Sequence, residues 1–118
     1  MAFRSCSMCG RPWATLTDFA RDPETRPLGV TVNFDEPYLS LIFFVHGCGT
    51  TIGVPAGELR PLLPPLEGPV LCETEECRHH CLTFSDLVAC DRPCRNAPLR
   101  RLLADLDAAK SGTPRSAP

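Results

Sequence analysis

The grouping of the cysteines constrains this chain more than any other feature of its sequence. Eight cysteines occur among 118 residues. Seven of them lie in short segments: Cys6 with Cys9, Cys48 two residues after His46, and the run Cys77, Cys81, Cys90 and Cys94. A chain of this length has room for one domain with a modest core, and its thirteen prolines interrupt regular elements. We therefore expect the grouped cysteines to supply cross-links, either disulfide bonds or metal ions.

The expected compartment favours metal ions. The N-terminal stretch MAFRSCSMCGRPWATLTDFA lacks the apolar run of about seven to fifteen residues and the small-residue cleavage site of a signal peptide. The longest uninterrupted apolar run, Leu41 to Val45, is too short to span a bilayer. We therefore expect a cytoplasmic protein with no membrane partner, in which grouped cysteines are typically metal ligands or redox groups.

The stretch SCSMCGRPW predicts a metal-binding turn. Two residues separate Cys6 from Cys9, so both thiolates can face one ion, and Gly10 allows the positive φ that such a turn needs. The stretch HGCG interrupts two apolar strands, YLSLIFFVH and TTIGVPA. A glycine turn between strands requires neither His46 nor Cys48. We therefore predict that these two side chains complete a tetrahedral zinc site of three sulfurs and one nitrogen.

Two such turns carried by β-structure resemble the zinc ribbon, in the broad sense, over roughly the first half of the chain. The resemblance is carried by Cys6, Cys9, Gly10, Cys48 and Gly49. The chain departs from the ribbon pattern at His46, because the second turn of a ribbon usually has Cys-x-x-Cys. The resemblance implies an antiparallel β-hairpin sheet around one closed zinc site within residues 1–56.

A second cysteine group lies in CETEECRHHCLTFSDLVACDRPC. Cys77 and Cys81 are four residues apart, as are Cys90 and Cys94, and residues at this spacing share one face of a helix. We expect a helical pair at Cys77 and Cys81, a helical stripe in residues 82–89, and part helix and part turn before Cys94 because of Pro93.

Several chemistries fit this second group. We favour one zinc ion bound by all four cysteines. Two disulfides or an iron–sulfur cluster are alternatives, and His79 or His80 is a candidate to replace one cysteine. Cys72, next to acidic residues, is interpreted as a small apolar side chain.

The remaining pattern predicts a small α+β fold. We expect a helical turn over residues 17–21 capped by Thr17, a strand over 28–34, and a proline-rich connector that contains at most one helical turn, near Glu58. An amphipathic helix over 97–110 begins after a cap at Asn96. One leucine stripe then faces the core: Leu99, Leu102, Leu103 and Leu106. The expected organisation is a single metal-stabilised domain over residues 1–110, with a cysteine-rich helical part over 70–110 and a disordered tail over 111–118.

No catalytic motif accompanies the expected metal sites. The sequence has no glycine-rich phosphate loop, His-Glu-x-x-His helix or nucleophile-elbow serine. A site with four protein ligands also lacks the open position of catalytic zinc. We therefore predict a non-catalytic cytoplasmic protein in which two zinc ions stabilise a protein-interaction or regulatory surface.

Two other functions stay open at this point. One is a redox or iron–sulfur protein that uses the cysteines from Cys77 to Cys94. The other is a nucleic-acid-binding zinc module, motivated by a local group of arginines: Arg92, Arg95, Arg100 and Arg101. The net charge of −2 disfavours nucleic acid as a partner of the whole chain.

Overall fold

A computed structural model describes residues 3–71, 74–75, 77 and 79–111. Its elements in chain order are the strands β1 (Arg4–Ser5) and β2 (Pro12–Trp13), helix α1 (Leu16–Arg21), strands β3 (Thr25–Thr31), β4 (Leu41–His46) and β5 (Thr51–Pro55), and helix α2 (Ala97–Ser111). Short 3₁₀ turns cover Pro37–Leu39, Ala56–Leu62 and His80–Leu82. The expectations for Cys72 and for residues 112–118 lie outside the described residues, whereas Ser111 is the last residue of α2.

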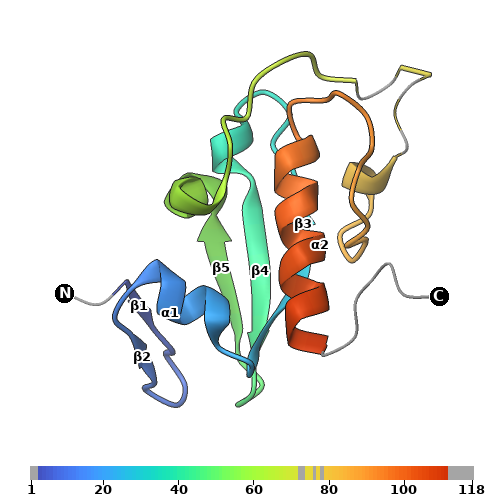
Figure 1. Ribbon diagram of the computed structural model, residues 1–118. Coiled ribbons are helices and arrows are strands. Elements are labelled where there is room, and N and C mark those ends of the chain that lie inside the picture. The colour runs from blue at the N-terminus through green and yellow to red at the C-terminus, as the bar shows by residue number, and fades with distance from the viewer. Residues whose placement is uncertain (1–2, 72–73, 76, 78, 112–118) are drawn as a thin grey trace.

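The strands form two antiparallel sheets, which confirms the predicted α+β class with a C-terminal helix. β1 pairs with β2, and β4 lies between β3 and β5 in the larger sheet (Figure 1). The predicted strand over 28–34 is shifted: β3 begins at Thr25, opposite His46, and ends at Thr31. It ends there because the Asn33 side chain accepts hydrogen bonds from the backbone N–H groups of Asp35 and Glu36, which turns the chain.

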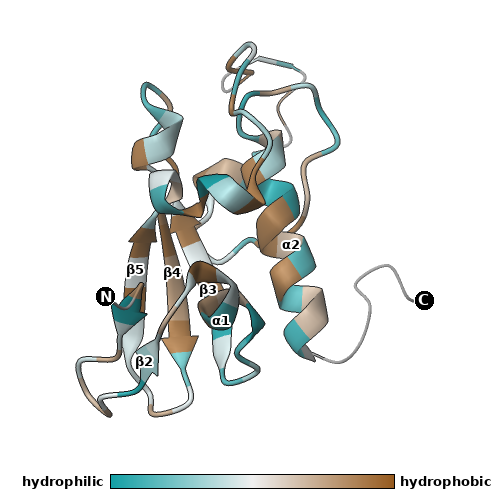
Figure 2. Cartoon of the chain, turned by 60° about the vertical axis from the view of Figure 1, so that its left-hand side comes forward, coloured by the Kyte–Doolittle hydropathy of each residue, from teal (hydrophilic) through white to brown (hydrophobic). Residues whose placement is uncertain are grey.

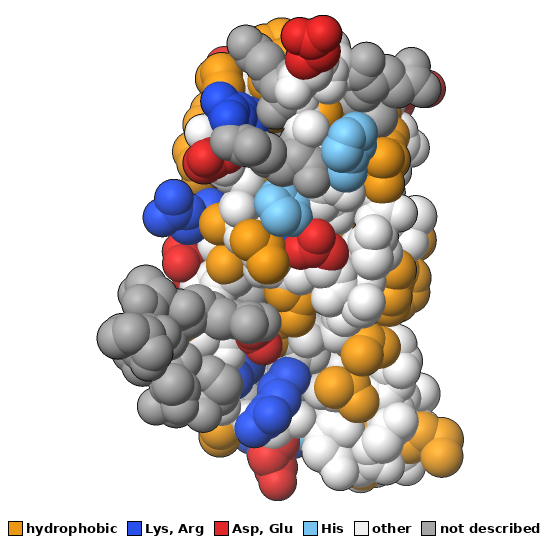
Figure 3. All heavy atoms as spheres, turned by 90° about the vertical axis from the view of Figure 1, so that its right-hand side faces the viewer, with side chains coloured by type: hydrophobic (Ala, Val, Ile, Leu, Met, Phe, Trp, Pro, Cys, Tyr) orange, Lys and Arg blue, Asp and Glu red, His pale blue; other side chains and the backbone are white. Residues whose placement is uncertain are grey.

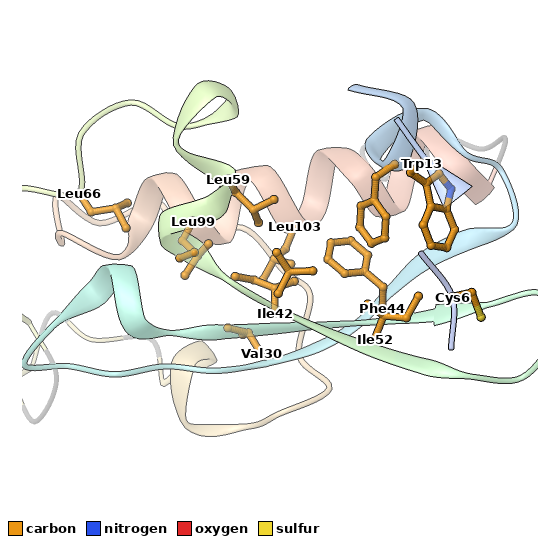
Figure 4. Packing of buried hydrophobic residues seen from close by; sticks show 13 residues of the cluster. Cys6, Trp13, Val30, Ile42, Phe44, Ile52, Leu59, Leu66, Leu99 and Leu103 are labelled. Atoms are coloured by element: carbon orange, nitrogen blue, oxygen red, sulfur yellow. The ribbon is translucent and has the colours of Figure 1, made fainter. Parts of the chain in front are cut away.

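Helix α2 covers one face of the larger sheet (Figures 1 and 2). The leucine stripe is confirmed, because Leu99 and Leu103 are fully buried and Leu102 and Leu106 are partly buried against the same cluster. On the sheet side, Val30, Ile42, Phe44 and Val54 meet these leucines. Figure 4 shows Cys6 beside Trp13 and Phe44 at one end of this core.

The predicted cap of α1 is wrong by two residues. Thr15, not Thr17, is the N-cap: its hydroxyl accepts from the Asp18 N–H (3.1 Å), and the Asp18 carboxylate accepts from the Thr15 N–H (3.3 Å). This reciprocal capping box satisfies two backbone donors at once. At α2, the Asn96 carbonyl accepts from the Arg100 N–H, but the Asn96 side chain makes no hydrogen bond and so does not cap the helix.

The predicted helical stripe over residues 82–89 is also wrong. Within the described part of this segment, only His80–Leu82 form a 3₁₀ turn, and Cys81 is therefore not on an α-helix with Cys77. The groups that a helix would pair are bonded elsewhere: the Phe84 carbonyl accepts from the Val30 N–H, and the Val88 N–H donates to the Asp86 carboxylate. In an α-helix the Val88 N–H would donate to the Phe84 carbonyl.

Candidate metal centre

The structure brings the four ligands predicted in the first half of the chain together. One potential ligand atom from each of Cys6, Cys9, His46 and Cys48 lies within 4.8 Å of all the others. The sulfurs of Cys6 and Cys48 are 3.5 Å apart, although 42 residues separate them. Cys6 and His46 are buried, whereas Cys9 and Cys48 are exposed. The cluster therefore joins the β1–β2 turn to the tip of the β4–β5 hairpin, at the edge of the core.

Each turn is closed by a glycine with positive φ. The Gly10 N–H donates to the Cys6 carbonyl (2.9 Å), and the Gly49 N–H donates to the His46 carbonyl (2.7 Å). The φ angles of Gly10 and Gly49 are 78° and 96°, in the region that L-residues with a Cβ rarely adopt. The expected role of glycine after the second ligand of each turn is confirmed. The two turns are local structures that direct a pair of ligands toward one point.

Buried hydrogen bonds hold the imidazole of His46 in position. Thr25 Oγ1 lies 3.1 Å from His46 Nδ1, and Thr25 also helps to lower the pKa of the Asp22 carboxyl. Because Nδ1 is engaged by the Thr25 hydroxyl, Nε2 is the nitrogen available to a metal. A metal-ligating histidine almost always donates its second ring N–H in this way.

Asp22 anchors this chain of hydrogen bonds. Trp13 Nε1–H donates to its carboxylate (2.8 Å), as does the Glu24 N–H (2.9 Å), and Arg11 pairs with it at 3.2 Å. Burial raises the pKa of Asp22, but these hydrogen bonds and the Arg11 charge hold the pKa below its usual value. The Trp13 ring also packs nearly perpendicular to the His46 ring, with centroids 5.2 Å apart.

The sulfurs of Cys6 and Cys9 do not ionise equally. The Cys9 N–H donates to the Cys6 sulfur. This hydrogen bond outweighs the opposing effect of burial, so the pKa of Cys6 falls to about 6. The Arg11 N–H favours the Cys9 thiolate, but burial and the sulfurs of Cys6 and Cys48 together raise the pKa of Cys9. The Cys6 thiolate thus forms readily, and its negative charge disfavours ionisation of Cys9. A bound divalent cation would offset this repulsion between the two thiolates.

The second cysteine group is arranged differently. Cys77, Cys81, Cys90 and Cys94 line one cavity of about 20 Å³ near the N-terminus of α2. Over the described ranges of the chain, the group at Cys6 is the one set of three or more His, Cys, Asp or Glu side chains already close enough to hold an ion. The prediction of a metal at the second group therefore stays a prediction, and the seven described cysteines are all free thiols.

The charges around the second group act on Cys81 most clearly. Burial raises the pKa of Cys81 to about 11; the charge of Arg100 opposes this rise, and the three other cysteines of the cavity add to it. His79 and His80 also line the cavity. His79 is exposed, whereas His80 Nδ1 lies 2.7 Å from the Asp86 carboxylate. Figure 3 shows histidine, acidic and hydrophobic side chains mixed on this side of the molecule.

One of the four arginines that motivated nucleic-acid binding is buried. Arg100 is fully buried and bonds Asp86 and Val88. Arg95 donates to the Gly68 carbonyl, and Arg92 lies 3.5 Å from Asp91. Arg100 therefore cannot contact a phosphate backbone, and the predicted patch loses one of its four charges.

Three residues of the first site were missed at the sequence level. Thr25, Asp22 and Trp13 position His46, yet no motif marks them. The signal lies in the strand register, because Thr25 pairs directly with His46 across β3 and β4.

Comparison of this chain with protein-family models, curated proteins and solved structures finds no match in any of the three. Within the described residues, neither helix has the length and apolar character needed to cross a membrane.

Proposed function

We propose that this chain is a non-catalytic zinc-binding protein in which the metal fixes the β1–β2 turn to the β4–β5 hairpin. The observation that carries the proposal is the convergence of Cys6, Cys9, His46 and Cys48 within 4.8 Å. Three thiolates and one imidazole suit zinc, which imposes little geometric preference of its own and takes both ligand types. Four protein ligands close the coordination shell, so the site supports a structural role rather than catalysis.

The proposed role of the fold is to present a surface to another protein. Residues Leu41 and Phe43 of β4 alternate with buried residues and so lie on the sheet face opposite α2. The Phe84 ring, 5.5 Å from that of Phe43, extends this face. Leu41 and Phe84 are 39 % and 42 % exposed, and exposed apolar side chains that adjoin one another are typical of interaction sites.

Metal analysis of the purified protein tests the zinc proposal. The wild type, purified without added metal, should contain zinc at the first site, and Cys9→Ser should lose this zinc and melt at a lower temperature. The reason is that structural zinc-binding energy, on the order of 10 kcal/mol, is partly folding energy. Ser7→Ala is the control, because Ser7 lies in the same turn and is exposed. Unchanged zinc content and melting temperature in Cys9→Ser would refute the site.

A separate comparison tests the interaction surface. The wild type and Leu41→Asp are compared at equal zinc content. Proteins that cross-link to the wild type but not to Leu41→Asp are the expected partners. If the two proteins give the same cross-linked set, the β4 face is not the interaction surface, whereas the zinc proposal is unaffected.

A further inference from the structure

We propose that Cys77, Cys81, Cys90 and Cys94 form a second metal site, a tetrathiolate that binds one zinc ion beside the N-terminus of α2. The four side chains line the same cavity, although the two pairs come from segments nine residues apart. Four thiolates complete a closed tetrahedral shell for zinc. This site is independent of the proposed function at Cys6, and each can be wrong without the other.

A buried amide points to a charged ligand in this cavity. Asn96 lines the cavity and is 1 % exposed, yet neither Oδ1 nor Nδ2 of its side chain has a hydrogen-bond partner. Burying an amide without a partner is unfavourable, because its hydrogen bonds to water are lost and not replaced. Metal-bound thiolates are acceptors for an amide N–H, so an occupied site would remove this cost at Nδ2. An apolar cavity would gain nothing from an asparagine at this position.

Positive charge also lies beside the cavity. Zinc with four thiolates carries two net negative charges. Arg92 lines the cavity, and its Nε lies 3.5 Å from the Asp91 carboxylate. Arg100 is fully buried and pairs with Asp86 at 3.0 Å. A guanidinium beside the sulfurs favours their thiolate forms.

The backbone between the first pair of cysteines is constrained as in a metal-binding turn. The His79 N–H donates to the Cys77 sulfur at 3.3 Å. Among the described residues other than glycine, His79 is the one with positive φ, at 66°. Such a conformation costs free energy and persists where surrounding structure holds it. A metal bound to Cys77 and Cys81, on either side of His79, would hold this turn.

The buried amide favours a metal ion over the disulfide alternative. Two disulfides would leave the side chain of Asn96 without a hydrogen-bond partner, because a disulfide sulfur carries no charge and is a weak acceptor. Metal-bound thiolates, in contrast, accept an amide N–H.

Cobalt titration of the full chain under anaerobic, reducing conditions tests the site. The wild type should bind two Co²⁺ ions, one with three sulfur ligands and one with four. Cys90→Ser/Cys94→Ser should bind one ion and keep only the spectrum of the three-sulfur site. Cys9→Ser should keep the spectrum of the tetrathiolate site. One Co²⁺ ion per wild-type chain, or an unchanged ion count in Cys90→Ser/Cys94→Ser, overturns the proposal, as does pairing of these cysteines in disulfides when the native protein is isolated.

Asn96→Leu gives a second test that does not remove a ligand. Loss of an outer-shell hydrogen bond typically weakens metal binding about 10- to 100-fold. Chelator competition should therefore show weaker binding of the second Co²⁺ ion and unchanged binding of the first. If Asn96 were only an unpaired buried amide, leucine would stabilise the metal-free protein and leave both affinities unchanged, which would contradict the proposed role.

Discussion

The hydroxyl of Thr25 decides which nitrogen of His46 faces the metal site. It lies 3.1 Å from Nδ1, so Nε2 is the nitrogen that is free to bind a metal. Because Thr25 and His46 are directly paired across β3 and β4, the larger sheet orients this ring in addition to the turn that holds the His46 backbone. The other three ligands are positioned by turns.

Thr25→Val should therefore weaken zinc binding at the first site while the fold is kept. Valine has nearly the same shape but cannot accept the Nδ1 proton, and the loss of such an outer-shell partner costs about 10- to 100-fold in affinity. Chelator competition measures the effect. Thr31→Val, an exposed position on the same strand, is the control, and equal affinities of the two variants would contradict the role of Thr25.

Asp22→Asn should destabilise the protein at neutral pH by about 1–3 kcal/mol, because hydrogen bonds to a charged group are lost. The pKa of Asp22 is lowered in the folded state, so the carboxylate stabilises the fold above about pH 4 and this contribution disappears as the pH falls through the lower folded pKa. The difference in unfolding free energy between wild type and variant should thus narrow in acid. Asp35→Asn, at an exposed position, should show no such difference; a pH-independent difference for Asp22→Asn would contradict the assignment.

The ligands were predictable from the sequence, whereas their supports were not. Cys6, Cys9, His46 and Cys48 lie in two short turns whose spacing and glycines are local properties. Trp13, Asp22 and Thr25 reach His46 only through the fold, and a shift of one residue in strand register would turn Thr25 to the other face. Sequence patterns of this length carry no signal for such a contact.

At the scale of elements, two similar turns on separate hairpins share one construction. Each ends in a glycine of positive φ whose N–H bonds the carbonyl of the first ligand of its turn. The described residues near Cys77 do not form a turn of this kind. Residues 82–89, which follow, were wrongly predicted to be helical. There the Val30 N–H, distant in sequence, takes the Phe84 carbonyl that a helix would bond to the Val88 N–H, and helix propensity cannot reveal such a competitor.

Gly49→Ala should destabilise the β4–β5 turn and weaken zinc binding. No atom lies within 4 Å of a Cβ at this position, so the cost is that of the backbone conformation alone, about 1–2 kcal/mol. Gly49→Asn is the matched variant, because asparagine adopts positive φ more readily. Thermal unfolding should rank the wild type above Gly49→Asn and Gly49→Asn above Gly49→Ala; equal melting temperatures for the two variants would show that the conformation is not required.

At the scale of the whole molecule, α2 connects the two cysteine groups. Its 15 residues span roughly 22 Å. Asn96, just before the helix, lines the second cavity. Near the other end, Lys110 Nζ donates to the carbonyl oxygens of Asp22 and Thr25, the residues that support His46. Burial lowers the pKa of Lys110 to about 8. The helix therefore contacts the supports of one site and the lining of the other.

Few apolar contacts hold residues 79–95 against the rest of the protein. The segment contains only one short 3₁₀ turn, and Leu82, Phe84 and Val88 are exposed, whereas Leu87 is partly buried against the core. Its contact with β3 is narrow but specific. The Val30 N–H donates to the Phe84 carbonyl at 3.0 Å, and a Cβ on Gly29 would clash with that same oxygen. The Val30 amide therefore reports whether this segment is docked on the edge of the sheet.

If a metal holds the segment, Cys90→Ser/Cys94→Ser should release it while the sheet stays folded. Hydrogen exchange followed by NMR should show the Val30 amide exchanging at least about tenfold faster, because local opening then needs less free energy than global unfolding. Amides of β4, the central strand, should keep their protection, since β3 and β5 still flank it. Cys9→Ser should give the opposite pattern, with faster exchange near Thr51 at the hairpin tip and an unchanged Val30. Equal acceleration of all strands in both variants would mean that the molecule unfolds as one unit and that the two cysteine groups do not stabilise separate regions.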